Sequence, residues 1–305
     1  MNDPLPSWND GAAKAAILDF VAGVTAEGGQ GYVAPTERIA AFDNDGTLWC
    51  EKPLYVQADF IFRKWTAMVA ADPSLASEQP YKAVVERDGA WLAAMLDHVP
   101  ELLKGLGTAF GGLTTDAFED QVRAFFADAR HPTLGVPYAK VGYVPMVELL
   151  AYLDANGFKV FICTGGGRDF VRVVGEEMYG IPRERVIGSG PTLEYRDGAL
   201  YRLTGVEQPI DDGAGKPVHI WTRTGRTPLL AGGNSDGDLA MLETARFALL
   251  VHHDDAEREF AYDTGSERAL AEAAACGWTV VSMKDDFSTV FEVAPTGAVV
   301  AGTPG

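Results

Sequence analysis

The chain of 305 residues is 47% hydrophobic, which is enough to fill the cores of two domains or of one large α/β domain with an insertion. Its formal net charge of −18 disfavours long-range attraction to nucleic acid or to an anionic membrane, so we expect neither as a partner. The three cysteines are widely spaced, which fits neither a disulfide framework nor a zinc site, and Cys163 is expected to be a buried small hydrophobe.

No apolar run reaches the roughly 18 residues that a membrane-spanning helix needs, and the N-terminus lacks the basic and apolar regions of a secretory signal. We therefore expect a soluble, cytoplasmic protein. A periplasmic location stays open, because a mature chain that has lost its signal peptide would look the same. The sequence does not indicate an oligomeric state.

The N-terminal part of the chain predicts one helix and one buried strand. Apolar side chains over residues 11–23 are spaced as in a helix, and a Gly-rich link follows at residues 28–31. Residues 39–41 then form an apolar run that leads into Asp43 and Asp45, within the sequence FDNDGT. Neighbouring carboxylates raise one another's pKa unless a cation or strong donors hold both ionised. Such a pair at a strand end points to ligand chemistry, although an Asp/Gly turn could also simply close the strand.

A long helical region follows the aspartate pair. Between Thr47 and about Gly142 the apolar residues recur with helical spacing, and Pro100 and Gly111 interrupt them. This pattern predicts a helical segment inserted after the first strand.

Strands and helices alternate in the second half of the chain. Residues 159–163 form an apolar run, and Pro145 marks the start of the helix before it. The same patterns predict strands at residues 185–188, 226–231, 247–251 and 278–282, a hairpin at 193–201 and a helix at 267–275. This alternation favours an α/β fold, with a Rossmann-like, doubly wound and mostly parallel sheet.

Two of these strands end in groups that can hold an anion or a cation. Thr164 and three glycines from Gly165 onward precede a helical pattern, and backbone N–H groups at such a place can cradle a phosphate. The strand at residues 226–231 runs into Asn234 and Asp238, which offer oxygen ligands, and Lys216 lies between the two segments. Plain alternatives are a helix cap at Thr164, a solvated lysine and a surface turn.

In this order, the four segments resemble the motifs of the haloacid dehalogenase superfamily, and specifically its phosphatases related to phosphoserine phosphatase. The resemblance covers about residues 38–252 and implies a haloacid dehalogenase-like core at residues 1–48 and 142–293. It also implies a helical cap domain at residues 49–141. Residues 294–305 are small and rich in Gly and Pro, so we expect a flexible tail.

The resemblance also implies roles for individual residues. Asp43 is the nucleophile that forms an aspartyl-phosphate, and Asp45 is the acid that protonates the leaving oxygen and then activates water. The implied cofactor is Mg²⁺, held by the Asp43 carboxylate, the Asp45 backbone carbonyl and Asn234. The other implied roles are phosphate binding by Thr164, Gly165 and Lys216, and orientation of the lysine or of a metal-bound water by Asp238.

One position departs from the family pattern. The fourth motif usually opens with Asp, whereas this chain has Asn234, whose amide oxygen can ligate Mg²⁺ but brings no charge. Asp236 or Asp238 could supply the missing carboxylate. The specificity candidates are Glu51 and Lys52, near a glutamate position of phosphoserine phosphatases, together with Trp49, Arg63, Trp65, Arg130 and His131.

We therefore expect a Mg²⁺-dependent phosphomonoester hydrolase that acts on a small phosphorylated metabolite. A phosphotransferase of the same chemistry and a catalytically silent phospholigand-binding protein are the alternatives. A hydrolytic dehalogenase needs neither an acid at Asp45 nor the Asn234 loop, so both features argue against it.

Overall fold

The computed structural model describes residues 3–94 and 98–293, so the predicted tail at residues 294–305 lies outside the described residues. The described chain divides into two compact units, and the first comprises residues 3–53, 129–189 and 211–293. The second comprises residues 54–128 and 190–210. None of the described helices is long and apolar enough to cross a membrane.

The first unit is built on a six-stranded parallel sheet with the order β3-β2-β1-β6-β7-β8. Its strands are β1 (Ile39–Phe42), β2 (Lys159–Gly167), β3 (Val186–Ser189), β6 (Leu230–Gly233), β7 (Phe247–His252) and β8 (Thr279–Ser282). The chain starts at the central strand β1 and adds β2 and β3 on one side. It then crosses over and adds β6, β7 and β8 on the other side, as in other doubly wound sheets. The predicted Rossmann-like α/β fold is confirmed.

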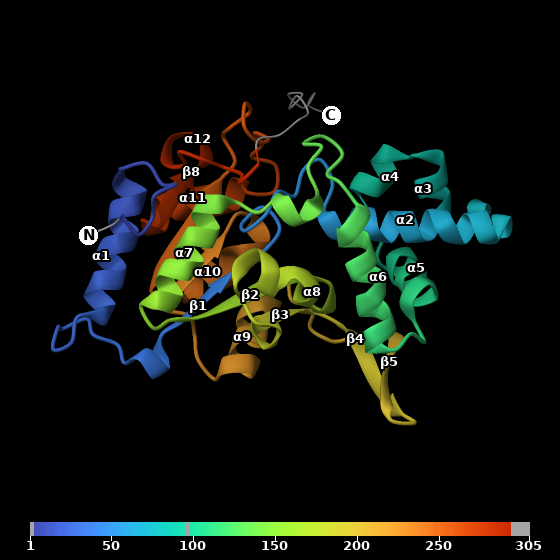
Figure 1. Ribbon diagram of the computed structural model, residues 1–305, viewed down its shortest axis with the longest axis horizontal. Coiled ribbons are helices and arrows are strands. Elements are labelled where there is room, and N and C mark those ends of the chain that lie inside the picture. Colours follow the sequence, from blue (N-terminus) through green and yellow to red (C-terminus); the bar gives the residue numbers. More distant parts are fainter. Residues whose placement is uncertain (1–2, 95–97, 294–305) are drawn as a thin grey trace. The chain divides into compact units, whose positions relative to one another are not determined.

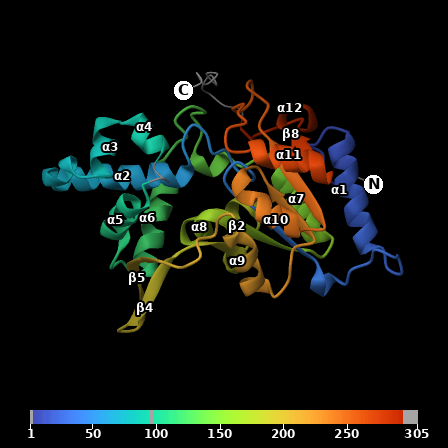
Figure 2. The same cartoon turned by 180° about the vertical axis from the view of Figure 1, so that it is seen from behind.

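Helices cover both faces of this sheet. Figure 1 looks onto the face covered by α7 (Val144–Ala155) and α8 (Arg168–Tyr179). Figure 2 looks onto the opposite face, covered by α9 (Gly215–Thr224), α10 (Leu239–Thr244) and α11 (Glu267–Cys276). The remaining helices of this unit are α1 (Ala12–Thr25) and α12 (Met283–Asp286).

The core of the first unit follows the two-residue repeat of its strands. Alternate residues of β1 and β2, such as Ala41 and Cys163, pack with Ile220 of α9 and Ala269 of α11 in one buried cluster. Cys163 is fully buried, as predicted, and all three cysteines are free. Because strands in this sheet are buried on both faces, their apolar runs are continuous rather than alternating.

The second unit is helical, with one hairpin. It contains α2 (Val56–Ala71), α3 (Tyr81–Glu86), α4 (Gly89–Ala93), α5 (Val99–Phe110) and α6 (Thr115–Asp128), together with β4 (Pro191–Arg196) and β5 (Ala199–Val206). A group of phenylalanines forms its interior, with Phe60 stacked on Phe110 at 5.3 Å and edge-on to Phe118 and Phe125.

The boundaries of the second unit differ from the predicted cap at residues 49–141. The hairpin, which we placed in the core, belongs to this unit because the Arg202 guanidinium lies 3.7 Å from the Phe118 ring centroid. Residues 129–141 belong instead to the first unit, where the Val141 carbonyl accepts a hydrogen bond from the Cys50 N–H at 3.0 Å. The role of the helical unit as a cap stays a prediction.

Candidate active site

The predicted site residues of β1, β2 and β6 lie at the carboxyl ends of adjacent strands. Phe42 is in register with Ile162 of β2 and with Gly232 of β6, so the residues that follow Phe42 and Gly232 emerge at one edge of the sheet. Gly232 is required for this approach, because a Cβ there would lie 2.4 Å from Cδ1 of Phe42. The sheet therefore brings the first, second and fourth motifs together.

Lys216 lies at the centre of this edge. Its Nζ donates hydrogen bonds to Asp43 Oδ1 at 2.6 Å and to the Cys163 carbonyl at 2.8 Å, and it lies 2.8 Å from Asp238 Oδ1. The contact with Asp238 is an ion pair, and the two hydrogen bonds fix the position of the ammonium group. Lys216 and both carboxylates are buried, which makes the group a charge cluster rather than a surface ion pair.

Burial dominates the electrostatics of this cluster. It raises the pKa of the Asp43 carboxyl well above its usual range, Asp238 raises it further, and the Lys216 ammonium opposes both. Burial alone would lower the pKa of Lys216, but Asp238 and Asp43 outweigh it, and the pKa of the lysine is well above its usual value. Lys216 is therefore a permanent cation that favours an ionised Asp43.

Asp238 is held by the loop that contains Asn234. Its Oδ2 accepts hydrogen bonds from the Asn234 N–H at 3.0 Å, the Ser235 N–H at 3.0 Å and the Ser235 hydroxyl at 3.1 Å, while Oδ1 faces Lys216. Gly233 permits this packing, since a Cβ there would lie 2.5 Å from that of Asp238. The structure thus places Asp238 where it can orient Lys216.

Asp236, the alternative ligand, points elsewhere. Its Oδ1 accepts a hydrogen bond from the Ala269 N–H at 2.8 Å, in the first turn of α11. A carboxylate at a helix N-terminus is stabilised by the unpaired N–H groups there. Asp236 therefore stabilises the N-terminus of α11, and its carboxylate is not part of the Lys216 cluster.

Asp45 lies on the turn that follows β1 and is partly exposed. Its Oδ1 accepts a hydrogen bond from the Trp49 indole N–H at 2.8 Å. Burial by the surrounding protein raises the pKa of Asp45 to about 7, with a contribution from Glu51, while the Trp49 hydrogen bond and Lys216 oppose the rise. A carboxyl group that titrates near neutral pH is suited to both donate and accept a proton.

Thr164 and Gly165 lie where β2 meets α8. Thr164 is buried, and its hydroxyl accepts a hydrogen bond from the Gly166 N–H at 3.1 Å. Gly165 is exposed and packs beside the loop before α9, where a Cβ on the glycine would lie 3.6 Å from the Asp211 carbonyl. The three glycines continue β2 up to Gly167, through an irregularity in its pairing with β3, and α8 begins directly after them.

Oxygen atoms suitable for Mg²⁺ occur at this edge. The Asn234 side-chain oxygen accepts a hydrogen bond from the Thr47 hydroxyl at 3.0 Å, which fixes the amide beside the turn after β1. Asp43 Oδ2 receives no hydrogen bond from the described residues. No group of three or more His, Cys, Asp or Glu side chains among the described residues could hold a metal. One carboxylate with neutral oxygen donors fits Mg²⁺, which keeps waters and binds through the phosphate of a substrate.

A buried polar cluster packs against the turn after β1 that carries Asp43 and Asp45, which we call the aspartate turn. This cluster was not predicted. His253, just after β7, has Nε2 at 2.8 Å from the Gly46 carbonyl and Nδ1 at 3.2 Å from Glu259 Oε2. Glu259 also accepts hydrogen bonds from the Tyr143 hydroxyl at 2.8 Å and the Cys50 thiol at 3.2 Å. The two adjacent histidines directly after an apolar strand were the available sequence signal.

The specificity candidates lie in different places. Glu51 is buried and accepts a hydrogen bond from the Tyr262 hydroxyl at 2.6 Å, and the Lys52 ammonium lies 4.4 Å from the Tyr262 ring centroid. His131 Nε2 lies 2.6 Å from the Lys52 carbonyl. Trp65 donates to the Gly105 carbonyl inside the helical unit. The last two candidates are exposed and bind nearby chain: Arg63 pairs with Asp59, and Arg130 donates to Gly135.

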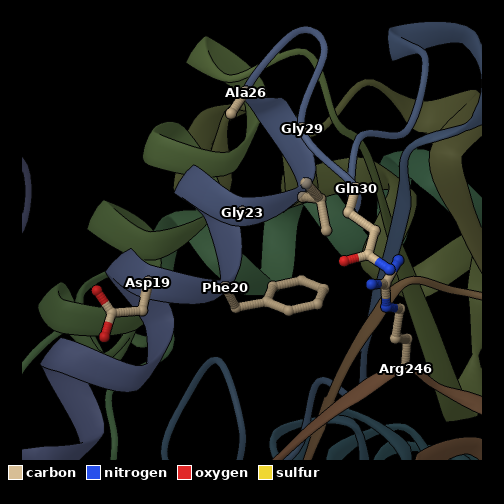
Figure 3. Close-up of a pocket in the computed structure, with 9 residues that line it drawn as sticks. Asp19, Phe20, Gly23, Ala26, Gly29, Gln30 and Arg246 are labelled. Carbon is tan, nitrogen blue, oxygen red and sulfur yellow. The ribbon is translucent and has the colours of Figure 1, made fainter.

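A separate open pocket of about 460 Å³ lies at the opposite edge of the sheet (Figure 3). It lies between the end of α1 and Arg246, which directly precedes β7. Figure 3 shows the side chains of Gln30 and Arg246 pointing toward one another, with the Phe20 ring beside them. Because β7 starts at this edge, the pocket is remote from the carboxyl ends of the strands and takes no part in the site.

Two solved structures of similar fold cover most of this chain. A conserved protein of unknown function from Anaerococcus prevotii is 17% identical, covers 92% of this chain and 94% of its own, and has a TM-score of 0.59. A protein of unknown function from Bordetella pertussis is 18% identical over 80% of this chain and 98% of its own, with a TM-score of 0.54. At these identities the likeness shows the fold alone.

A phosphoserine phosphohydrolase-like protein from Francisella tularensis is 13% identical over 80% of this chain and 94% of its own, with a TM-score of 0.45. No curated protein matches the sequence. The model of the haloacid dehalogenase-like hydrolase family matches residues 40–243, which is more than half of the chain and includes all four motifs. The chain therefore belongs to the haloacid dehalogenase-like hydrolase family.

Proposed function

We propose that this hydrolase is a Mg²⁺-dependent phosphomonoesterase of the branch related to phosphoserine phosphatase. The observation that carries the proposal is the buried contact of Lys216 Nζ with Asp43 Oδ1 at 2.6 Å. The Lys216 ammonium opposes the rise in the pKa of Asp43 that burial causes, and so favours the carboxylate form that a nucleophile needs. Asp45 adds a carboxyl group with a pKa of about 7 on the same turn.

The proposed reaction has two steps. Asp43 attacks phosphorus, the bond from phosphorus to the leaving oxygen breaks, and Asp45 gives its proton to that oxygen. Asp45 then takes a proton from water, which attacks the aspartyl-phosphate, releases inorganic phosphate and restores the Asp43 carboxylate. Lys216, Thr164 and the Gly165 N–H group would contact the phosphoryl oxygens, and Asp238 would keep Lys216 in place.

We propose that the Asp43 carboxylate, the Asp45 backbone carbonyl and the Asn234 amide oxygen hold Mg²⁺. The bound ion would offset the negative charge of the phosphoryl group during transfer. Asn234 supports the assignment, because its side-chain oxygen is held at this edge by Thr47.

The proposed substrate is a small phosphorylated metabolite. The net charge of −18 opposes binding of nucleic acid or of an anionic membrane surface. A small phosphomonoester needs a positive electrostatic potential only at the site itself. We propose that the helical unit, residues 54–128 and 190–210, serves as the cap that selects the leaving group.

The test is release of inorganic phosphate from p-nitrophenyl phosphate, with Mg²⁺ or with EDTA. We expect turnover that requires Mg²⁺ and that falls by about 10³-fold or more in Asp43→Asn, because the nucleophile is lost. Asp236→Asn is the matched control, since this carboxylate binds the Ala269 N–H group, and its turnover should stay within about twofold of native.

Other outcomes would contradict the proposal in identifiable ways. Transfer of the phosphoryl group to added alcohols in preference to water would indicate a phosphotransferase. Binding of phosphate without turnover at any Mg²⁺ concentration would indicate a silent binding protein. Turnover that survives Asp43→Asn would show that another group is the nucleophile.

A further inference from the structure

The Asp45 side chain is fixed on one oxygen and open on the other. Oδ1 accepts the hydrogen bond from the Trp49 indole N–H at 2.8 Å. Within the described part of the chain, Oδ2 has no hydrogen-bond partner, and Asp45 is partly exposed. The two carboxyl oxygens of Asp45, which is proposed to act as both acid and base, are therefore in different surroundings.

Trp49 is itself held rigidly. It is fully buried, and its ring packs against Phe170 and Tyr179 at centroid distances of 6.5 and 6.4 Å. Its backbone N–H donates to the Asn44 carbonyl at 3.2 Å, and its carbonyl accepts from the Gly46 N–H at 2.9 Å. These bonds tie Trp49 to both neighbours of Asp45, so the indole and the carboxyl group share one rigid frame.

The indole N–H group determines which oxygen of Asp45 can carry a proton. The indole nitrogen only donates, so it can neither take a proton from Asp45 nor accept a hydrogen bond from it. When Asp45 is protonated, its proton therefore lies on Oδ2, the oxygen that is open. A glutamine, histidine or hydroxyl at the same place could act as donor or acceptor and would leave the choice of oxygen undetermined.

We propose that Trp49 is a positioning residue that fixes the rotamer of Asp45 and directs its Oδ2 proton toward the leaving oxygen of the substrate. This inference rests on the proposed phosphatase chemistry. The competing explanation is that Trp49 only fills the core, as its full burial would suggest. A test must therefore measure proton delivery and not only activity.

The dependence of rate on the leaving group provides that measurement. p-Nitrophenolate leaves without a proton, whereas the phenolate of phenyl phosphate, with a pKa of about 10 like that of tyrosine, benefits from one. In single-turnover experiments, Trp49→Phe should slow phenol release by about tenfold or more but p-nitrophenol release by no more than about threefold. Phe170→Leu, which disturbs the same packing but keeps the indole N–H, should slow both probes by similar factors.

The outcomes separate this inference from the proposed function. If the native protein releases neither alcohol, the proposed function fails. If the native protein is active and Trp49→Phe slows both probes equally, Trp49 is a core residue only and the inference is wrong.

A spectroscopic readout does not depend on the folding of Trp49→Phe. With ¹⁵N-labelled tryptophan, Asp45→Ala should move one indole N–H resonance upfield, because that N–H group loses a carboxylate acceptor. The indoles of Trp8 and Trp65 donate to backbone carbonyls and should stay in place. If no indole resonance moves, the Trp49–Asp45 contact is absent and the inference is overturned.

Discussion

Gly46 meets two independent constraints within the aspartate turn. Its φ of +74° lies in the left-handed region, which disfavours any side chain. A Cβ at this position would also lie 2.1 Å from Asn234 Nδ2 and 2.7 Å from its Cγ. Glycine therefore allows Asn234 to lie directly against the turn that carries Asp45.

Replacing this glycine should damage both stability and turnover. We expect Gly46→Ala to lower the free energy of unfolding by about 3 kcal/mol, since a steric clash is added to backbone strain. Turnover of p-nitrophenyl phosphate should fall about tenfold or more, because Asn234 must move. Denaturant unfolding and phosphate release measure the two effects.

Gly28 supplies a matched control. Its φ of +78° is nearly the same, but a Cβ there would have nothing within 4 Å. Gly28→Ala should therefore cost only the backbone strain, about 1 kcal/mol, and leave turnover within about twofold of native. Equal effects of the two substitutions would show that the contact with Asn234 does not matter.

At the scale of elements, the loop after β7 supports the turn after β1. His253 Nε2 lies 2.8 Å from the Gly46 carbonyl, and because a carbonyl only accepts, this nitrogen carries a proton. Glu259 holds the other ring nitrogen and also binds Tyr143 and Cys50. The buried Glu259 carboxylate therefore holds His253 in contact with the aspartate turn.

Removal of that carboxylate should be costly. We expect Glu259→Ala to lower the free energy of unfolding by about 3 kcal/mol or more, because the buried donors of Tyr143 and Cys50 lose their shared acceptor and His253 loses its partner. Glu257→Ala, at an exposed position of the same loop, should change it by no more than about 0.5 kcal/mol. Urea unfolding of both variants measures the difference, and a similar small change in both would contradict the anchoring role.

The sequence predicted the strands and their polar ends well, and for a physical reason. Apolar runs mark the buried strands, and parallel strands bring their carboxyl ends to one edge, so the convergence of Asp43, Thr164 and Asn234 follows from topology. Contacts such as His253 with Gly46 depend on side-chain packing across 207 positions of sequence, which no local periodicity records. The placement of the hairpin with α5 and α6 was missed for the same reason.

At the scale of the whole molecule, the two units have separate interiors. In the helical unit, Gly105 lies against Trp65 and Pro80, and a Cβ on it would be 2.7 Å from Trp65 Cζ2 and 2.5 Å from Pro80 Cγ. The sheet unit has its own buried cluster, to which these residues do not belong. A defect inside one unit should therefore loosen that unit first.

Gly105→Ala tests this division. Overpacking of about 1 to 3 kcal/mol should speed amide hydrogen exchange in residues 54–128 and 190–210, while exchange in β1 and β6 stays as in the native protein. Gly89→Ala, in the same unit but with nothing within 4 Å of its Cβ, should change exchange little. A loss of protection spread evenly over the chain would show a single cooperative unit.

The charges around Lys216 couple the proposed binding of the cation to that of the phosphomonoester. Two carboxylates and one ammonium leave the resting cluster with a single negative charge, and Asn234 adds none. A phosphate dianion alone would make this buried region strongly negative, whereas a dianion and a divalent cation together leave its charge unchanged. Under the proposed chemistry, cation and phosphomonoester therefore raise one another's affinity by the same factor.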